Sequence, residues 1–544
     1  MYMRAIISYT ALIAANNEGR VDGMKIAFLM LGENVSCIGA FRVATVIKKI
    51  ETNTDAYFIL LHNERSLVTY LNPNKANLTL SFSEDAEIIA QKLAGYDMVC
   101  FSSMSNAFNY AAEISEKLKE RYGADVFTLL GGVHARLFPN EAIEHFDAIC
   151  TGEGEKPARQ LIEAFREGRD FYHARGLWFK KDGAVIKNPP EALNSNEELN
   201  EFQAGYNLFN CWIYDIKKKK FVKFRRSHYL KFAGVQYNTM WTLGCPYACT
   251  YCSNSGFAEA DKGNRKLRYP NPEVVIREIE QELALHPYVR NVSFHDDNLT
   301  ALPYDVLKEF CVLYKARINL PFAVYGIHPK TINKEKLDLL AAHGMMRSKL
   351  GIESGCEKTL KQYGRNMSIQ TIRDAVAIST AIQRKYRRHM IPPDFDVITD
   401  NPTETREDIV ASLRLYNSFD RPFTFNVFSL RKFPGTKLTA CFDENGIECP
   451  DLPFFQVRPT ICNVLLYLIA CHKIPDRLFE RWLLKVRGNE EEQKEYKALL
   501  RMAHFIYLAK RGLDCVLKMD LSRFSGTWLY VYWCVFYGWR KKRR

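Results

Sequence analysis

The chain has 544 residues, which is too long for one ordinary hydrophobic core and predicts several domains. Hydrophobic residues make up 47% and charged residues 25%, a balance that excludes a mainly disordered chain. The formal net charge of +13 is concentrated in two basic runs, residues 217–226 and 540–544. Such runs usually form solvated surface, so binding of anionic substrates, nucleic acid or lipid headgroups is a minority interpretation of them.

The N-terminal residues 1–23 have a short apolar run after Arg4 and small residues near position 14, as a weak signal peptide would. The segment MKIAFLMLG, which begins at Met24, instead indicates the buried first strand of a domain. We therefore expect residues 1–23 to be an extension, or Met24 to be the natural start.

Residues 24–169 alternate between apolar, strand-like runs and amphipathic segments with apolar residues at helical spacing. This alternation predicts an α/β domain with a doubly wound parallel sheet, whose ligands lie at the carboxyl ends of the strands. The five expected strands are residues 25–31, 56–62, 96–103, 125–132 and 147–152. Small and polar loops follow several of them.

The rest of the chain divides into three parts. Residues 170–235 are less regular and are interpreted as a linker. Residues 236–440 contain six β/α repeats, which predict a partial barrel with its active face on the loops after the strands. Residues 441–544 are expected to be mostly helical and end in TWLYVYWCVFYGWRKKRR. This tail suits peripheral contact with a membrane surface, although packing of the region as a cap on the barrel is the favoured alternative.

The 15 cysteines are mostly isolated in apolar segments, which argues against a secreted disulfide framework and for a reducing compartment such as the cytoplasm. Only Cys245, Cys249 and Cys252 lie close together, in GCPYACTYCSNSGF. A structural zinc site commonly uses four ligands in two CxxC pairs, and no second pair exists here. Three thiolates on a four-iron cluster leave one iron with open coordination, so we expect a reactive iron-sulfur cluster.

The spacing CxxxCxxC, with Tyr251 before the last cysteine and a barrel strand before the loop, resembles the radical S-adenosylmethionine (SAM) superfamily. The resemblance implies that Cys245, Cys249 and Cys252 ligate a [4Fe-4S] cluster and that Tyr251 lies beside SAM. In this family the open iron chelates the amino and carboxylate groups of SAM. Electron transfer to SAM then releases a 5′-deoxyadenosyl radical.

Two further segments resemble the family at expected strand ends. In VSFHDDNLT, Asp296 and Asp297 match the DD segment of many members, and Asp296 is expected near SAM. In LGIESG, Glu353 and Ser354 match the position on the ribose side of SAM. A carboxylate there can accept hydrogen bonds from both ribose hydroxyls, while a turn or helix-capping role is the alternative.

Three other segments extend the comparison. In KQYGRNMS, Arg365 is assigned to the SAM carboxylate, with a surface position as the alternative. DVITDNPTET occupies the place of a glycine-rich GLPGET in many relatives, and Asp400 and Asn401 depart from it, which puts a backbone contact to adenine in doubt. KFPGTKL, residues 432–438, matches a PGT turn and is expected to be structural.

The segment GGVHARLFPNEAIEHFDAICTGEGE, residues 131–155, resembles the cobalamin-binding subgroup of the superfamily, which includes C-methyltransferases and ring-forming enzymes. The resemblance then covers about residues 24–440 and implies a cobalamin site in the N-terminal sheet. The residues that it implies for cobalamin are Asn34, Ser36, Ser102, Ser103, Gly131, Gly132, Glu153 and Gly154.

One departure concerns the lower face of cobalamin. Many cobalamin domains carry DxHxxG after the first strand, whereas this chain has NVSCIG, with Ser36 in place of the histidine. Serine is a poor cobalt ligand compared with imidazole, so coordination by a histidine is excluded at this position. Cobalamin binding without that ligand and an empty, vestigial domain both stay open.

The resemblance implies a cobalamin-dependent C-methylation of an unactivated carbon. The alternatives are a cobalamin-independent radical cyclisation, C–C coupling or oxidation, and a cluster-stabilised scaffold that binds RNA or lipid. A small-molecule substrate and a reductant such as flavodoxin or ferredoxin are the expected partners, with no specific nucleic acid. The aromatic and basic tail hints at a lipid-like substrate, but no motif identifies the substrate.

Overall fold

The computed structural model describes residues 23–33, 35–62, 80–202, 204–205, 210–452, 456–488, 492–518 and 520. The predictions for residues 1–22, Asn34 and the C-terminal tail lie outside these residues. The described chain divides into two compact units. The first comprises the described residues up to Val235 together with Arg277–Val289, and the second comprises Gln236–Ile276 and the described residues from Arg290 onward.

The first unit is built on a nine-stranded sheet in the order β7-β6-β5-β4-β3-β1-β2-β8-β9. Neighbouring strands are parallel within the central run β5-β4-β3-β1-β2-β8. At the two edges, β6 pairs antiparallel with β5 and β7, and β9 pairs antiparallel with β8. The strands are β1 (Ile26–Gly32), β2 (Thr54–Leu60), β3 (Met98–Ser102), β4 (Phe127–Gly131), β5 (Ala148–Cys150), β6 (Leu177–Lys181), β7 (Ala184–Lys187), β8 (Cys211–Asp215) and β9 (Lys220–Lys223).

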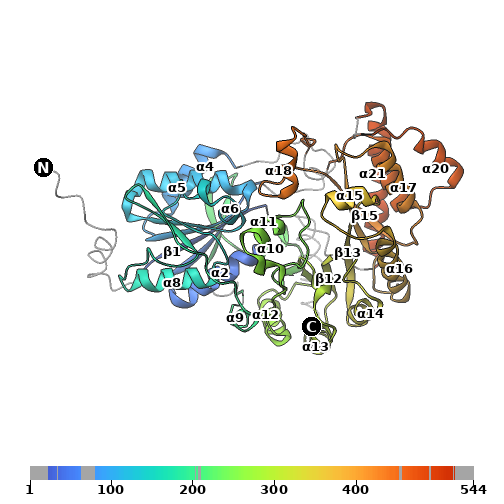
Figure 1. The fold of residues 1–544 in the computed structure, drawn as a ribbon. Helices are drawn as coiled ribbons and strands as arrows, with labels where there is room; N and C mark the ends of the chain where they lie inside the picture. Colours follow the sequence, from blue (N-terminus) through green and yellow to red (C-terminus); the bar gives the residue numbers. More distant parts are fainter. Residues whose placement is uncertain are drawn as a thin grey trace. The chain divides into compact units, whose positions relative to one another are not determined.

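Helices cover both faces of this sheet, as the doubly wound prediction requires (Figure 1). α4 (Phe82–Lys92) and α5 (Phe108–Tyr122) pack together on one face, and α2 (Ile38–Ile50) and α8 (Glu155–Arg166) pack together on the other. The central strands are apolar and buried because helices lie on both sides of them. The shorter helices are α6 (Val133–Leu137), α7 (Pro139–Ala142), α9 (Asn196–Leu199) and α10 (Arg226–Phe232).

Residues 170–235, interpreted from the sequence as a linker, contribute β6, β7, β8 and β9 to this sheet. These strands have four or five residues each, and β7 and β9 have no buried side chain. Strands of this length are too short to show the hydrophobic alternation by which strands are recognised. The basic run is surface, as expected, and Lys219 pairs with the buried Asp85 at 2.8 Å.

The order of the strands creates a switch point in the first unit. β1 lies between β2 and β3 in the sheet. The chain therefore passes from β1 to β2 on one side of β1 and then crosses to β3 on its other side. Loops that leave neighbouring parallel strands in opposite directions open a crevice at the carboxyl ends of the strands, which is where such sheets bind ligands. The crevice is therefore expected beside the ends of β1 and β3.

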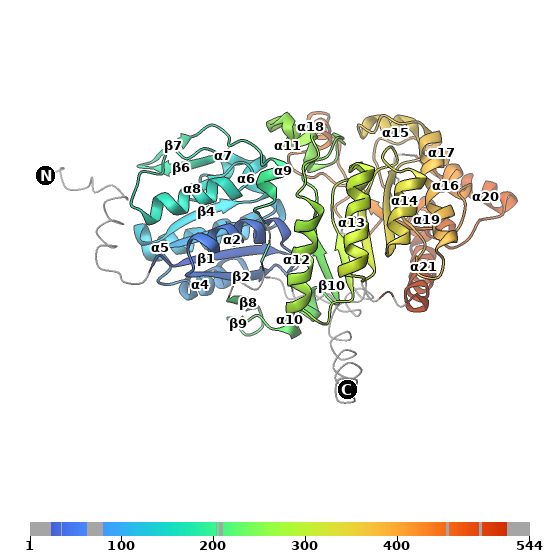
Figure 2. The same ribbon diagram turned by 90° about the horizontal axis from the view of Figure 1, so that it is seen from below.

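The second unit contains a six-stranded parallel sheet in chain order, β10 to β15, which confirms the predicted six β/α repeats. The strands are β10 (Gln236–Thr239), β11 (Asn291–Phe294), β12 (Phe322–Ile327), β13 (Met345–Glu353), β14 (Asp394–Thr399) and β15 (Thr424–Ser429). Figure 2 shows α13 (Tyr304–Arg317), α14 (Lys334–Ala342) and α16 (Ile369–Lys385) following one another along the outside of this sheet.

The remaining helices complete the second unit. They are α11 (Ser253–Ala260), α15 (Glu357–Gln362), α17 (Arg406–Asn417) and α18 (Lys437–Glu444), with α12 (Pro272–Leu285) divided between the two units. The C-terminal region is helical, as predicted, with α19 (Ile461–Cys471), α20 (Asp476–Leu483) and α21 (Lys497–Leu517). Of the helices that the structure describes, none is both long and apolar enough to cross a membrane.

A buried ionic network lies within the second unit, between β13, β14 and the end of the C-terminal region. Arg347 is fully buried; its Nη1 lies 3.3 Å from Asp394 Oδ2, and its Nη2 contacts Asp520. Arg511 of α21 donates from Nη2 to Asp394 Oδ1 at 2.9 Å. The network therefore ties α21 and the segment after it to the strands.

We expect Arg347→Ala to lower the free energy of unfolding by about 3–5 kcal/mol, because it leaves buried carboxylates with fewer cations. Arg317→Ala is the matched control, since it removes an ion pair with Glu273 whose side chain is 45% exposed, and should cost less than about 1 kcal/mol. Urea denaturation followed by circular dichroism measures both variants. Equal losses in the two variants would show that the network does not hold the unit together.

Candidate active site

The three cysteines of the predicted cluster lie on the loop between β10 and α11. Cys252 is the residue before the first turn of α11, where the positive end of the helix dipole favours a thiolate. Gly244, which opens the loop, has φ of +86°, and a Cβ atom there would lie 2.4 Å from Lys266 O. Only glycine fits such a left-handed position at this close approach.

Backbone hydrogen bonds fix this loop on two sides. Cys245 N donates to Asn264 O at 3.0 Å, and Thr250 N donates to Tyr363 O at 3.0 Å. Thr250 O accepts from Leu438 N at 2.9 Å, at the end of the PGT turn. The turn therefore has the structural role that its sequence predicts.

All three thiols are free and only partly buried, which suits ligation. Burial raises the pKa of Cys245 and of Cys252 to about 12 and also raises the pKa of Cys249, which Arg365 lowers in turn. Cluster binding must therefore displace protons from these thiols. Among the described residues, no three His, Cys, Asp or Glu side chains converge on a point for a single metal ion, whereas a cluster binds each thiolate at a different iron.

Arg365 links the cysteine loop to β13. Its side chain is buried; Nη1 donates to Tyr251 Oη at 3.1 Å and lies 3.8 Å from Cys249 Sγ, while Nη2 donates to Gly351 O. Arg365 therefore lies inside the site. The alternative interpretation, a position on the surface, is wrong. Tyr251 also packs edge-on against Tyr363, with ring centroids 5.3 Å apart.

Glu353 lies at the carboxyl end of β13, next to Arg365. Its Oε1 is 3.6 Å from Arg365 Nη1, and a Cβ atom at Gly351 would lie 2.5 Å from the same oxygen. Glu353 has φ of +64°, a strained conformation for a residue with a side chain. Burial raises the pKa of its carboxyl to about 7, although Arg365 lowers it. A strained, buried carboxylate beside the cysteines is a functional-site feature.

Asp296 lies after β11 and fastens the start of the cysteine loop. Its Oδ1 accepts hydrogen bonds from Trp241 N at 3.1 Å and from Thr242 Oγ1 at 2.7 Å. Its Oδ2 is buried and has no partner among the described residues. Burial raises the pKa of Asp296 to about 6. Asp297 is exposed and raises the pKa of both Cys245 and Cys252, so it lies on the cysteine side.

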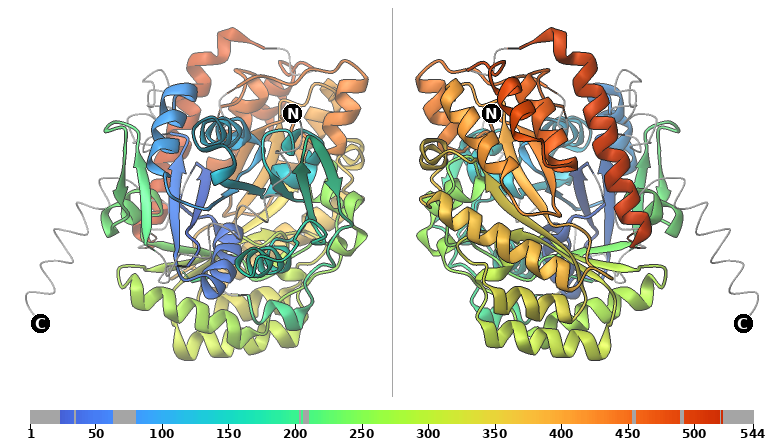
Figure 3. Two further views of the ribbon diagram at one scale, coloured as in Figure 1. Left: turned by 90° about the vertical axis from the view of Figure 1, so that its left-hand side faces the viewer. Right: turned by 90° about the vertical axis from the view of Figure 1, so that its right-hand side faces the viewer.

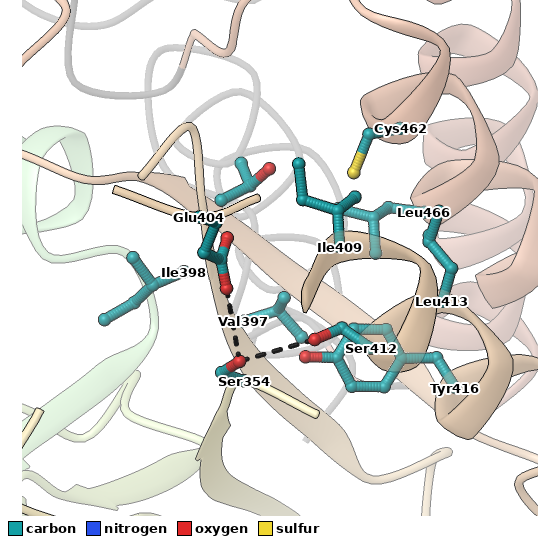
Figure 4. A pocket seen from close by; sticks show the side chains of 11 residues that line it. Ser354, Val397, Ile398, Glu404, Ile409, Ser412, Leu413, Tyr416, Cys462 and Leu466 are labelled. Atoms are coloured by element: carbon teal, nitrogen blue, oxygen red, sulfur yellow. Dashed lines mark hydrogen bonds between the residues drawn. The ribbon is translucent and has the colours of Figure 1, made fainter. Parts of the chain in front are cut away.

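Ser354 points into a small crevice between β14, α17 and α19, towards Glu404 and Ser412 (Figure 4). Its Oγ lies 3.5 Å from Glu404 Oε1 and 3.4 Å from Ser412 Oγ. Glu404 also accepts from Thr359 Oγ1 at 2.8 Å, and burial raises its pKa to about 7. The structure thus gives Ser354 hydroxyl and carboxylate partners within the protein, and its assignment to SAM stays a prediction.

Asp400 and Asn401, which depart from the family pattern, are both fully buried. Asp400 has φ of +57° and accepts from Asn463 Nδ2 at 2.8 Å and from Arg458 N at 3.0 Å. Asn401 Nδ2 donates to Tyr363 Oη at 3.1 Å. These side chains therefore connect β14 to α19 and to the segment that carries Arg365, which explains why polar residues stand here.

The accessible face of the second sheet carries polar residues that sequence reasoning missed. Lys349 Nζ lies 3.1 Å from Asp396 Oδ2, and Asn426 Nδ2 donates to Asp396 Oδ1 at 2.9 Å. The three residues belong to β13, β14 and β15 and are partly exposed, whereas their neighbours along the strands are mostly buried. In RSKLGIE and DFDVIT, polar residues alternate with apolar ones. This alternation indicates a strand with one polar face and could have identified Lys349 and Asp396.

In the first unit, four predicted cobalamin residues meet at the carboxyl ends of β3 and β4. Ser102 is paired with Gly131 in the register, and Ser103 N donates to Gly131 O at 3.3 Å. Gly132 has φ of +99°, and a Cβ atom there would lie 2.6 Å from Ser103 O. Ser103 Oγ is buried without a partner among the described residues. Such a glycine-lined strand end with an unsatisfied hydroxyl fits a ligand beside the switch point.

The other predicted cobalamin residues divide into two groups. Ser36 lies in the loop after β1, beside the switch point. Glu153 instead accepts from Asn194 N at 2.7 Å, and a Cβ atom at Gly154 would lie 3.0 Å from Val43 Cγ2. These contacts show that Glu153 holds the chain after β7 and that Gly154 allows α8 to approach α2. Their assignment to cobalamin stays a prediction.

We expect Glu404→Gln to change the pH dependence of stability. Because burial raises the pKa of Glu404, the folded chain binds a proton that the unfolded chain releases between about pH 4.5 and pH 7. This contribution is present at low pH and is lost as the pH rises through about 7, and it amounts to at most about 3 kcal/mol. Urea midpoints at pH 5 and pH 7 should therefore differ less in Glu404→Gln than in the wild type. Exposed Glu407→Gln is the control and should behave as the wild type; a shared pH dependence would refute the assignment.

Two family models match the chain. The model of the radical SAM superfamily matches residues 239–416, which include the cysteine loop, Glu353 and Arg365. The model of the B12 binding domain matches residues 60–162, which include Ser102, Ser103 and the two glycines after β4.

Three curated relatives give the extent of similarity. The chain is 24% identical over 368 residues to an uncharacterized methyltransferase of Pyrococcus horikoshii, which covers 66% of this chain and 72% of the relative. It is 28% identical over 308 residues to cytidylyl-2-hydroxyethylphosphonate methyltransferase of Streptomyces wedmorensis, covering 52% of this chain and 55% of the relative. It is 23% identical over 347 residues to anaerobic magnesium-protoporphyrin IX monomethyl ester cyclase of Synechocystis sp., covering 63% of each. The chain thus spans less than two thirds of the last two relatives.

Two solved structures share the fold. The radical SAM methyltransferase TsrM from Kitasatospora setae, with tryptophan and a SAM analogue bound, has a TM-score of 0.57 at 16% identity and covers 77% of this chain and 76% of that protein. The cobalamin-dependent SAM radical enzyme OxsB with aqua-cobalamin has a TM-score of 0.56 at 14% identity and covers 91% and 75%. Both predicted architectures are confirmed by these likenesses. The chain therefore carries a radical SAM domain over residues 239–416, and a B12 binding domain over residues 60–162 precedes it.

Proposed function

We propose that this radical SAM enzyme methylates an unactivated carbon of a small-molecule substrate, with cobalamin as the methyl carrier. The observation that carries the proposal is a three-cysteine loop beside Glu353 and Arg365, in a chain that also has a B12 binding domain. Two of the three relatives described above are methyltransferases. When bound, the cluster and SAM supply a 5′-deoxyadenosyl radical that abstracts hydrogen, and cobalamin supplies a transferable methyl group.

A second candidate is a radical cyclase, C–C coupling or oxidation enzyme that works without cobalamin. The cyclase among the relatives favours it. The glycine-lined strand end with the unpartnered Ser103 hydroxyl favours a domain that still binds its ligand, and therefore favours methylation. A scaffold that only binds RNA or lipid is disfavoured, because the radical SAM match covers the cysteine loop and the strand ends that surround it.

We assign distinct tasks to the residues around the cysteine loop. Cys245, Cys249 and Cys252 would hold the cluster through three thiolates. Glu353 would accept hydrogen bonds from the SAM ribose, because its carboxylate lies beside Arg365, which also contacts Cys249, and Arg365 is its one ion-pair partner among the described residues. Arg365 would hold Glu353 and the loop in position, since its donors already contact Tyr251, Cys249 and Gly351. Asp296 would position the start of the loop through its hydrogen bonds with Trp241 and Thr242.

The substrate would lie on the accessible face of the second sheet, next to Glu353. Lys349 and Gly351 lie on one face of β13, and Glu353 joins them, because its Oε1 would lie 2.5 Å from a Cβ atom at Gly351. Asp396 and Asn426 are the register partners on the next two strands. Lys349 Nζ also lies 5.1 Å from the Phe428 ring centroid. Lys349, Asp396 and Asn426 pair with one another but are partly exposed, so a hydrocarbon on this face would remove their remaining contacts with water, which is costly. The part of the substrate that enters this face should therefore carry hydrogen-bonding groups, whatever the rest of its structure.

Two further assignments complete the proposal. Radical chemistry on SAM needs one electron at a time, so a small redox protein such as flavodoxin or ferredoxin is the proposed reductant. A cytoplasmic location is proposed because the 14 cysteines that the structure describes are all free thiols.

The cluster is tested by Cys249→Ala. After anaerobic reconstitution, the wild type should contain about four iron and four sulfide per chain and should release 5′-deoxyadenosine from SAM with dithionite. Cys249→Ala should lose both properties, because it removes one of three thiolate ligands. The control is Cys441→Ala, which changes an exposed cysteine on α18 and should match the wild type. Deoxyadenosine release by Cys249→Ala at the wild-type rate would exclude this loop as the cluster site.

The role of Glu353 is tested by Glu353→Gln in the reconstituted protein. The substitution keeps the size of the side chain and removes the negative charge, so the Kd for SAM should rise about 10-fold or more while the iron content stays unchanged. Equilibrium dialysis with labelled SAM measures the Kd. Glu357→Gln, at the exposed start of α15, is the matched control. An unchanged Kd in Glu353→Gln would leave Glu353 with a structural role only.

A further inference from the structure

The helix α21 exposes an apolar face that the proposed chemistry does not use. Six of the fourteen large hydrophobic side chains that are exposed in the described chain lie between residues 502 and 517 of this helix. They are Met502 (55% exposed), Phe505 (64%), Ile506 (45%), Leu513 (59%), Val516 (56%) and Leu517 (69%). Scattered single hydrophobic residues are normal on a surface, but a contiguous group of this size marks an interaction site.

These residues form one stripe along the helix. Their spacing of three and four residues places them on the same side, and the exposed Ala498 and Ala509 continue that side. The opposite side is buried: Tyr507 donates to Phe425 O, and Arg511 reaches Asp394 at 2.9 Å. α21 lies on the outside of the second unit, against α19 (Figure 3). One side of the helix therefore contacts the rest of the second unit, and the apolar stripe on its other side is exposed.

Basic residues accompany the stripe. Residues 497–518 contain five basic side chains, of which Arg511 and Lys518 contact Asp394 and Arg387 O away from the stripe, and one acidic side chain, Asp514, which lies 3.6 Å from Lys510 Nζ. Arg501 is exposed on the same side as the apolar stripe. The sequence after residue 520 adds a largely aromatic stretch and the basic run 540–544. An apolar stripe bordered by cations is the pattern of helices that lie at a membrane interface.

We propose that the exposed stripe of α21 docks the enzyme on a membrane surface that contains anionic lipid. The helix would lie parallel to the surface, with the stripe in the boundary between headgroups and acyl chains and with Lys497 and Arg501 at the headgroups. It would not span the bilayer, because its other side is fastened to the sheet by Tyr507 and Arg511. This inference goes beyond the proposed methylation and does not depend on it.

The basic side chains of α21 favour docking on anionic lipid over self-association of two chains through the same stripe. Two copies of α21 placed face to face would bring two basic helices together, and like charges across an interface oppose association. Anionic headgroups instead attract basic side chains near the surface, and this attraction weakens when salt screens it. Docking should therefore require anionic lipid and should decrease at high ionic strength.

The test uses the full chain and sucrose-loaded vesicles of phosphatidylcholine, with or without phosphatidylglycerol, followed by sedimentation. The wild type should sediment with the vesicles that contain phosphatidylglycerol, and less so in high salt. The double variant F505D/L517D should bind about tenfold or more weakly, because two exposed apolar side chains become acidic. V312D is the matched control, since Val312 on α13 is 55% exposed and lies outside the stripe, and it should bind as the wild type.

Three results would overturn the proposal. The first is equal sedimentation of the wild type and F505D/L517D, which would place lipid binding outside α21. The second is absence of lipid binding by a wild type that light scattering shows to be a dimer and that F505D/L517D converts to a monomer. The third is absence of both lipid binding and self-association. Circular dichroism of each variant confirms that the exposed substitutions leave the fold intact.

Discussion

The buried guanidinium of Arg365 is the interaction on which the site depends. It connects the cysteine loop, through Tyr251 and Cys249, to β13, through Gly351 and Glu353. A buried cation is costly unless anions surround it, and Glu353 is the one carboxylate within 4 Å of it in the described chain. Removal of this cation would leave Glu353 buried and the loop without its link to the sheet.

This arrangement couples cluster binding to the stability of the site. Without a cluster, burial keeps the three thiols protonated and neutral, because it raises the pKa of each. Cluster binding converts them to thiolates, which adds negative charge 3.8 Å from Arg365 at Cys249. The cation should therefore be better compensated in the loaded enzyme than in the empty one. Metal loading and ordering of the site then reinforce one another, as is common for metal sites.

Much of the fold could be predicted from the sequence because the strands that matter are buried on both faces. The runs around β1, β3 and β4 and the six later β/α repeats were visible as apolar segments between helical patterns. β6 to β9 were missed because each has only four or five residues, which is too short to show a periodic pattern. The cysteine spacing predicted its own site, since three thiols within eight residues have few other uses.

The contacts of single side chains could not be predicted in the same way. The departure at Asp400 put a backbone contact to adenine in doubt, but it gave no sign that the Asp400 side chain bonds to Asn463, 63 residues later. Likewise, Ser354 adjoins Glu353 in the chain but contacts Glu404, because β13 ends at Glu353 and the backbone there has a φ of +64°. Glu153 contacts Asn194 in a segment with no recognisable motif. Such pairings depend on tertiary distances that no local pattern encodes.

The central claim is that the chain transfers a methyl group from SAM to a carbon atom with cobalamin as the carrier. Its most direct test supplies the reconstituted enzyme with hydroxocobalamin, dithionite, SAM labelled with a trideuteromethyl group and an extract of the source cells. The account predicts a product that gains one labelled methyl group, formed together with 5′-deoxyadenosine and S-adenosylhomocysteine and only when cobalamin is present. A product that forms with 5′-deoxyadenosine but gains no label, or that forms equally without cobalamin, would contradict it.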